Sequence, residues 1–194
     1  ANLFLILGEI MQGNWDNVEG AVRGLQGAGM RMKYCSKPVV AAPHHYTFGG
    51  GVEICMHTDK CVICGETYAG LVEAGVCVIP AGGGTKECLV RALEHIPASV
   101  QNADAFPYVR RAFEAIATAK VATSGVEFIE LGHLRPTDII EPNFELQVGR
   151  AKDVCLGLIK MGYRPPRPPR LWALGDTGKA AFMAAVYGMK EAGW

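Results

Sequence analysis

The residues best suited to chemistry are two glutamates that stand close to glycines. Glu53 follows the run Gly49 to Gly51, and Glu73 comes twenty residues later as the only charge in the apolar segment 71–79. A carboxyl group in such a segment is either turned to solvent on a loop or buried, and burial raises its pKa toward the range that acid–base catalysis uses near neutral pH. Proton transfer is therefore a candidate chemistry, although first helical turns also favour acids such as Glu53 for purely electrostatic reasons.

The glycines beside Glu53 predict a site for negative charge. Val39 to Ala42 is typical of a short strand, the segment through Tyr46 and Phe48 of a second one, and the apolar residues after Gly51 of a buried helix that begins near Gly50. The first N–H groups of a helix have no partner within the helix and lie at its positive end. We therefore expect the Gly50 N–H to face an oxygen that carries negative charge, at a backbone that a ligand can approach closely.

Histidines and cysteines offer weaker candidates. Cys61 and Cys64, with His57 nearby, suggest a metal or redox site, but the chain has no second such pair. On a strand Cys61 and Cys64 would also point to opposite faces, and the same alternation separates His44 from His45. We therefore predict no metal site and a structural role for the two adjacent histidines.

The composition is that of a globular protein with a sizeable core. The chain has 194 residues, of which 49% are hydrophobic and 20% charged, which suits a single domain. Its 19 basic and 19 acidic residues leave no net charge, so nothing points to nucleic acid or an anionic membrane. No apolar run is long enough to span a membrane. Seven cysteines, set mostly in apolar runs, predict reduced thiols and a cytoplasmic location.

Helical periodicity accounts for most of the remaining chain. Gly82 to Gly84 lack the spacing of a phosphate loop and are interpreted as a strand-to-helix turn. The apolar first helix lacks cover, which predicts that the chain is a fragment of a longer polypeptide. The basic, proline-rich segment 163–170 predicts an extended linker. Strands are expected over 60–65 and 138–140, and helices over 3–11, 15–32, 85–96, 104–120, 124–132, 143–161 and 177–193.

Together these motifs resemble the crotonase (enoyl-CoA hydratase/isomerase) superfamily. The resemblance rests on Lys-Pro-Val-Val-Ala-Ala at 37–42, Gly-Gly-Gly-Val-Glu at 49–53, the second glutamate twenty residues later, and Ile-Pro-Ala-Gly-Gly-Gly-Thr at 79–85. The amino-acid sequences of segments 70–87, 119–124 and 131–136 are similar to the hydratase part of bacterial 3-hydroxyacyl-CoA dehydrogenases. Those are fused proteins of fatty-acid β-oxidation that carry an NAD-dependent dehydrogenase part ahead of the hydratase part.

The resemblance implies an α/β fold, a crotonase-type ββα spiral that lacks its first strands and is followed by a helical C-terminal region. We expect an N-terminally truncated core over 1–100, a helical oligomerisation or capping region over 101–162, and a Pro-rich linker with a C-terminal helix over 163–194. The family also implies a homo-oligomer of trimer type. NAD would belong to a fused or associated dehydrogenase part, so this chain would need neither a metal nor a redox cofactor.

The resemblance further implies a mechanism. An enoyl-CoA thioester would place its carbonyl oxygen between the N–H groups of Gly50 and Ala1, which stabilise the enolate-like charge. Glu53 would deprotonate the attacking water, and Glu73 would deliver a proton to Cα. The presence of two carboxylates favours a hydratase over an isomerase, because migration of a double bond needs only one shuttling base.

Several alternatives stay open from the sequence. An enoyl-CoA isomerase or another crotonase-fold reaction, such as thioester hydrolysis, would use the same oxyanion site. A non-catalytic fragment that binds CoA esters or oligomerises is the rival from a different class. Lys37, Lys86 and Arg91 are basic candidates for CoA-phosphate contacts. Many family members carry glycine at the position of His45.

Overall fold

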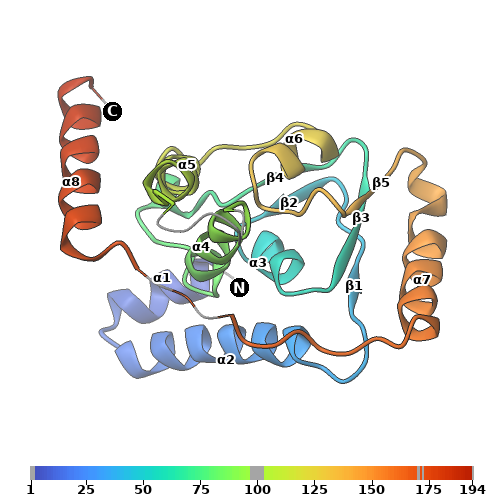
Figure 1. Cartoon of the computed structure of the whole chain (residues 1–194). Coiled ribbons are helices and arrows are strands. Elements are labelled where there is room, and N and C mark those ends of the chain that lie inside the picture. Colours follow the sequence, from blue (N-terminus) through green and yellow to red (C-terminus); the bar gives the residue numbers. More distant parts are fainter. Residues whose placement is uncertain (1–2, 97–102, 170, 172, 194) are drawn as a thin grey trace.

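The computed structural model describes residues 3–96, 103–169, 171 and 173–193, and Figure 1 shows how their elements are arranged. Within this part of the chain, five short strands form two parallel sheets. One sheet has the order β1 (Val40–Ala41), β3 (Lys60–Cys64), β5 (Ile139–Glu141), and in the other β2 (Tyr46–Phe48) pairs with β4 (Tyr68–Gly70). The sequence prediction of an α/β fold is confirmed, with sheets that are small and parallel.

The chain visits the two sheets in turn. It runs through β1 and β2 into helix α3 (Gly50–Met56), and then through β3 and β4 into a short 3-10 helix η1 (Glu73–Val76) and helix α4 (Gly84–Glu94). Each round thus adds one strand to each sheet before a helix returns the chain, as parallel pairing requires. Successive ββα rounds therefore bring the start of α3, the helix η1 and the start of α4 into one region.

The other helices surround this unit. Figure 1 shows α7 at one end of the molecule and α8 at the opposite end. Helix α7 packs on the sheet of β1, β3 and β5, and its buried Gln147 donates from Nε2 to the carbonyls of Pro43 and Val62 at 2.7 and 2.8 Å. The bounds of these helices are α1 (Leu3–Met11), α2 (Trp15–Lys33), α5 (Phe106–Ala117), α6 (Gly125–Glu130), α7 (Phe144–Lys160) and α8 (Gly175–Glu191).

The hydrophobic core lies between the sheets, α3, α4 and α6. Val52, Cys55 and Met56 on α3 are buried, and Phe128 of α6 is fully enclosed. Burial of such side chains is the main driving force for the fold. The cluster consists of Val52, Cys55, Met56, Cys61, Ile63, Ala69, Leu71, Cys88, Ala122, Phe128 and Leu134.

Most predicted elements are confirmed to within a few residues, with two omissions and one error. Strand β4 and helix η1 were not predicted from sequence. The argument that His44 and His45 face opposite ways was wrong, because both precede β2 and their rings lie 4.9 Å apart against Phe144. His45 has φ 51°, a backbone conformation that favours glycine, which agrees with the glycine that family members carry there.

The structure also bears on the membrane and cysteine predictions. Within the described residues, no helix combines the length and the apolar character needed to cross a bilayer. All seven cysteines are free thiols. The proposed boundaries at residues 100 and 162 stay a prediction, and the first of them lies outside the described residues.

Candidate active site

Glu53 lies in the first turn of α3, and its side chain is only 3% exposed. Its Oε1 accepts a hydrogen bond of 2.8 Å from the N–H of Gly84 at the start of α4. Burial raises the pKa of Glu53, while the backbone N–H groups of Gly84, Gly82 and Gly83 oppose that rise by stabilising the carboxylate. The carboxyl group is thus buried but supplied with donors for its charged form.

The three glycines leave no room for side chains beside Glu53. A methyl group at Gly82 would overlap Glu53 Oε2 and the side chain of Leu25. One at Gly84 would lie 2.7 Å from Pro80 Cβ and 3.1 Å from Glu53 Oε1. The glycine loop, residues 82–84, therefore wraps the carboxylate closely because it has no side chains.

Glu73 begins helix η1 and lies against the other side of the start of α3. A methyl group built on Gly49, the residue before α3, would be 2.9 Å from Glu73 Oε1. Glu73 Oε2 is buried and has no hydrogen-bond partner among the described residues. Burial raises the pKa of Glu73, and the charge of Glu53 raises it further. The two predicted acid–base residues therefore lie close enough for the charge of Glu53 to affect the pKa of Glu73.

Gly50 occupies the predicted position at the first residue of α3, and Gly49 before it has φ 51°. Gly49 donates its own N–H to the carbonyl of Gly70 in β4 at 2.9 Å, which ties the start of the helix to the sheet. The N–H of Gly50 is among those that find no acceptor within a helix. Ala1, the other predicted oxyanion donor, lies outside the described residues.

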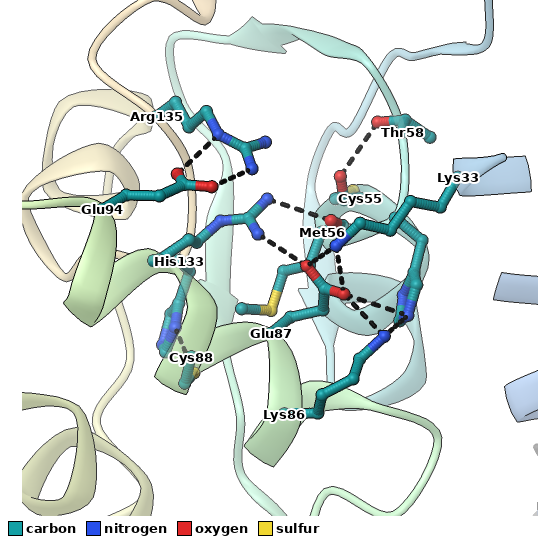
Figure 2. A network of polar contacts seen from close by, with 12 residues as sticks. Lys33, Cys55, Met56, Thr58, Lys86, Glu87, Cys88, Glu94, His133 and Arg135 are labelled. Atoms are coloured by element: carbon teal, nitrogen blue, oxygen red, sulfur yellow. Dashed lines mark hydrogen bonds and ion pairs between the residues drawn. The ribbon is translucent and has the colours of Figure 1, made fainter. Parts of the chain in front are cut away.

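A buried network of charges lies behind Glu53, and it was not predicted from sequence. At its centre is Glu87, which is fully buried and bonded to Lys33, Lys86 and Arg91 at 2.6, 2.7 and 3.1 Å. Figure 2 shows the Lys33 and Lys86 ammonium groups directed at this carboxylate. The donor hydrogen bonds from Lys33 and Lys86 lower the pKa of Glu87 to about 2 against the opposing effect of its burial. The i,i+4 spacing of Glu87 and Arg91 in α4 was the one signal available in the sequence.

The same network corrects one prediction for CoA-phosphate contacts. Arg91 is only 3% exposed, and its guanidinium binds Glu87 and the carbonyl of Met56. It is therefore enclosed rather than available to a phosphate. Lys86 keeps a partly exposed side chain but is also paired with Glu87.

The alternative hypothesis of a metal site at Cys61, Cys64 and His57 gains no support from the described residues. Among the described residues, no three His, Cys, Asp or Glu side chains gather in a way that would hold a metal ion. Cys61 is buried, with its Sγ 3.5 Å from Thr58 Oγ1 and 3.6 Å from the Cys55 carbonyl. A hydrogen bond with the Cys55 side chain, together with burial, raises the pKa of the Cys61 thiol, which favours its protonated form.

An apolar groove of about 750 Å³ lies between α4, α5 and α8. Its walls include Leu89, Val109, Phe182 and Val186, but neither Glu53 nor Glu73. The groove therefore lies apart from the two glutamates.

Comparison with known proteins gives one relative along the whole chain. A Bacillus subtilis (strain 168) protein named "Probable 3-hydroxyacyl-CoA dehydrogenase" is 38% identical over all 194 residues, which make up 24% of its own length. The chain thus spans about a quarter of that relative. No family model matches the chain.

Solved structures show the fold. An enoyl-CoA hydratase from Bacillus anthracis superposes on 74% of this chain and 48% of its own, with a TM-score of 0.59 and 23% identity. An enoyl-CoA hydratase from Polaromonas sp. JS666 covers 81% of this chain and 53% of its own, with a TM-score of 0.61 and 17% identity. At these identities the likeness establishes the architecture, over about half of each hydratase.

Proposed function

Because the chain has the crotonase fold and is homologous to 3-hydroxyacyl-CoA dehydrogenase and fatty acid oxidation complex proteins, we propose that it hydrates trans-2-enoyl-CoA to 3-hydroxyacyl-CoA in fatty-acid β-oxidation. In this proposal it is the hydratase part of a fused 3-hydroxyacyl-CoA dehydrogenase. Glu53 and Glu73 are the catalytic residues, and the N–H groups of Gly50 and Ala1 form the oxyanion hole.

One observation carries the proposal: two carboxyl groups with raised pKa values meet at the start of α3 in different surroundings. Glu53 receives N–H donors from the glycine loop, which favour its carboxylate form. Glu73 has an oxygen without a partner, and the charge of Glu53 favours its protonated form. These different surroundings support different roles in the proposed reaction, with Glu53 as the base and Glu73 as the acid.

The proposed steps balance as an addition of water. As the oxygen of water bonds to Cβ, its proton passes to Glu53, and Glu73 gives its proton to Cα. The Gly50 N–H stabilises the negative charge that develops on the thioester oxygen between these events. Exchange of protons with solvent then returns Glu53 to the carboxylate and Glu73 to the acid.

The test is the loss of the conjugated-thioester absorbance of crotonyl-CoA in the presence of the chain. We expect turnover, and a fall in kcat of about a thousandfold in both Glu53→Gln and Glu73→Gln. Glu66→Gln is the matched control, because Glu66 is exposed. Turnover that survives both substitutions would contradict the proposal. Turnover of a 3-enoyl-CoA that needs only one of the two glutamates would favour the isomerase.

We propose that the dehydrogenase step and its NAD belong to other residues of the fused protein, since the chain has no Gly-x-Gly-x-x-Gly motif. Assembly as a trimer-type homo-oligomer and the cytoplasmic location also stay predictions.

A further inference from the structure

His57 connects Glu53 to the buried charges behind it. The residue follows α3, four positions after Glu53, and its ring is 2% exposed. Its Nδ1 lies 2.6 Å from the Glu53 carbonyl oxygen. Because a carbonyl can only accept, Nδ1 carries the hydrogen, and burial lowers the pKa of His57, so the ring is neutral. Its Nε2 is then an acceptor, and Lys86 Nζ lies 3.2 Å away.

The ring of His57 also fixes the glycine loop. A methyl group on Gly83 would lie 2.6 Å from His57 Cε1, and one on Gly29 of α2 would lie 3.0 Å from Cγ. The imidazole is thus held between α2 and the loop whose N–H groups serve the Glu53 carboxylate. One side chain therefore touches the main chain of Glu53 and the backbone that donates to its side chain.

Glu87 holds the other side of the ring through Lys86. Lys86 Nζ lies 2.7 Å from Glu87 Oε1 and faces His57 Nε2 at the same time. This arrangement keeps a donor on Nε2 and so maintains the tautomer that donates to Glu53. The charged groups around His57 and Glu53 are Lys33 from α2, Lys86, Glu87 and Arg91 from α4, and Glu73 from η1.

We propose that His57 is a positioning residue for Glu53: its Nδ1–H bond to the Glu53 carbonyl and its contact with Gly83 hold the carboxylate in line with the N–H groups of the glycine loop. The inference rests on the proposed hydratase function. His57 touches no substrate in this scheme, so it acts on the rate only through the position and the pKa of Glu53.

Two amides separate the hydrogen bond from the volume of the ring. His57→Asn places an amide nitrogen near the position of Nδ1, and His57→Gln places one near Nε2. We expect His57→Asn to keep kcat for crotonyl-CoA within about threefold of the parent chain. We expect His57→Gln to lower kcat by about 10- to 100-fold with KM within about twofold, because the base is misplaced while substrate contacts remain. Equal activity of the two variants, or rescue by glutamine alone, overturns the proposal.

The pH profile gives a readout that a general loss of packing would not move. In His57→Gln the acidic limb of kcat/KM shifts to higher pH by roughly one unit, because Glu53 loses N–H donors that favour its carboxylate. All the charged neighbours named above are retained in both variants, so they cannot cause a difference between them. An acidic limb unchanged from the parent chain contradicts the role of His57.

A measurement without substrate separates failure of this inference from failure of the hydratase proposal. Carboxyl-carbon NMR of the chain labelled at glutamate, assigned with Glu53→Gln, follows the titration of Glu53 directly. We expect a higher pKa in His57→Gln than in the parent chain and no change in His57→Asn. If the parent chain shows no turnover but the Glu53 titrations still follow this pattern, the hydratase proposal is contradicted and the positioning role of His57 is supported. If the parent chain is active and Glu53 titrates with the same pKa in the parent chain and in both His57 variants, only the positioning role is contradicted. If His57→Gln does not fold by circular dichroism, a shifted Glu53 titration in His57→Asn overturns the inference and an unshifted one supports it.

Discussion

The two sides of the candidate site are built in different ways. On the Glu53 side the carboxylate lies in a helix, is bonded by the glycine loop and is backed by a network of buried charges around Glu87. On the Glu73 side the carboxyl group belongs to the first residue of a short 3-10 helix, and one of its oxygens has no hydrogen-bond partner in the part of the chain that the structure describes. The difference teaches that both acids have raised pKa values, but only Glu53 has backbone N–H donors from the glycine loop that favour its carboxylate form.

The largest expected effect tests whether the rate depends more on the exact position of the Glu53 carboxylate than on that of the Glu73 carboxyl group. Glu53→Asp shortens the side chain and withdraws the carboxylate from the Gly84 N–H, so we expect kcat to fall by about a thousandfold. In Glu73→Asp no hydrogen bond to Oε2 is broken, because this oxygen has no partner among the described residues. We therefore expect kcat to fall by only about tenfold. Rates of crotonyl-CoA hydration measure both. Equal losses would remove the distinction between the two sides.

The next effect concerns the buried network behind Glu53. Glu87→Gln leaves Lys33, Lys86 and Arg91 without a compensating charge, and we expect a loss of about 3 kcal/mol in the free energy of unfolding. Burial also lowers the pKa of Lys33, which means that desolvation of this cation offsets part of the stability that the ion pairs provide. We therefore expect a loss near the lower end of the range for broken buried ion pairs. Urea denaturation at pH 7 measures it. Glu94→Gln is the control, since its pair with Arg135 is partly exposed and worth less than about 1 kcal/mol.

The pH dependence of the Glu87 effect has a definite sign. The folded-state pKa of Glu87 is about 2, below the ordinary value of 4.5. Its contribution is therefore complete above 4.5 and is lost as the pH falls toward 2. The parent chain and Glu87→Gln should converge in stability over that window. A difference that stays constant down to pH 2 would show that the loss comes from packing and not from the charge.

A smaller effect is expected from the glycine loop itself. Gly84→Ala brings a methyl group 2.7 Å from Pro80 Cβ and should cost about 2 kcal/mol of stability. Gly149→Ala in α7 is the matched control: nothing lies within 4 Å of its new methyl group, so we expect a gain of about 0.5–1 kcal/mol. Thermal unfolding of the two variants measures both. A neutral Gly84→Ala would mean that the loop yields, and that the N–H groups around Glu53 are not fixed.

The sequence predicts the Glu53 side better than its surroundings. The break at Gly49 to Gly51 and the apolar residues after it predicted the start of α3 and the position of Glu53, because these are local signals. Strand β4 was missed because its sequence, Tyr-Ala-Gly, has no apolar run typical of a strand, and it is defined by pairing with β2. Helix η1 was missed for a similar reason, so the sequence left open whether Glu73 was buried.

Long-range partners explain the rest. Lys33 and Glu87 are far apart in sequence, and only the fold, which brings the end of α2 to α4, makes them an ion pair. His57 was weighed as a metal ligand with two cysteines, whereas its contacts are with Glu53, Gly29 and Gly83. Arg91 was one candidate for a phosphate contact because it is basic, but its side chain is buried and donates to Glu87. Residue type predicts what a group can bind, and the fold decides which partner it meets.

The smallest expected effect returns to Glu73. Because burial and the charge of Glu53 raise the pKa of Glu73 in the folded state, the fold opposes an ionisation that the unfolded chain undergoes freely, and this lowers stability at neutral pH. Glu73→Gln should therefore raise the free energy of unfolding by at most about 1 kcal/mol at pH 7, or roughly 3 °C in Tm. The gain should disappear as the pH falls below the ordinary value of 4.5, where the carboxyl group is protonated in both states. Calorimetry at pH 7 and pH 4 measures it. Glu53→Gln also removes a carboxyl group with a raised pKa, but an amide nitrogen cannot accept from the N–H groups of the glycine loop, so we expect a net loss of stability at pH 7. A variant that is stabilised on the Glu53 side, or destabilised on the Glu73 side, would reverse the assignment of base and acid.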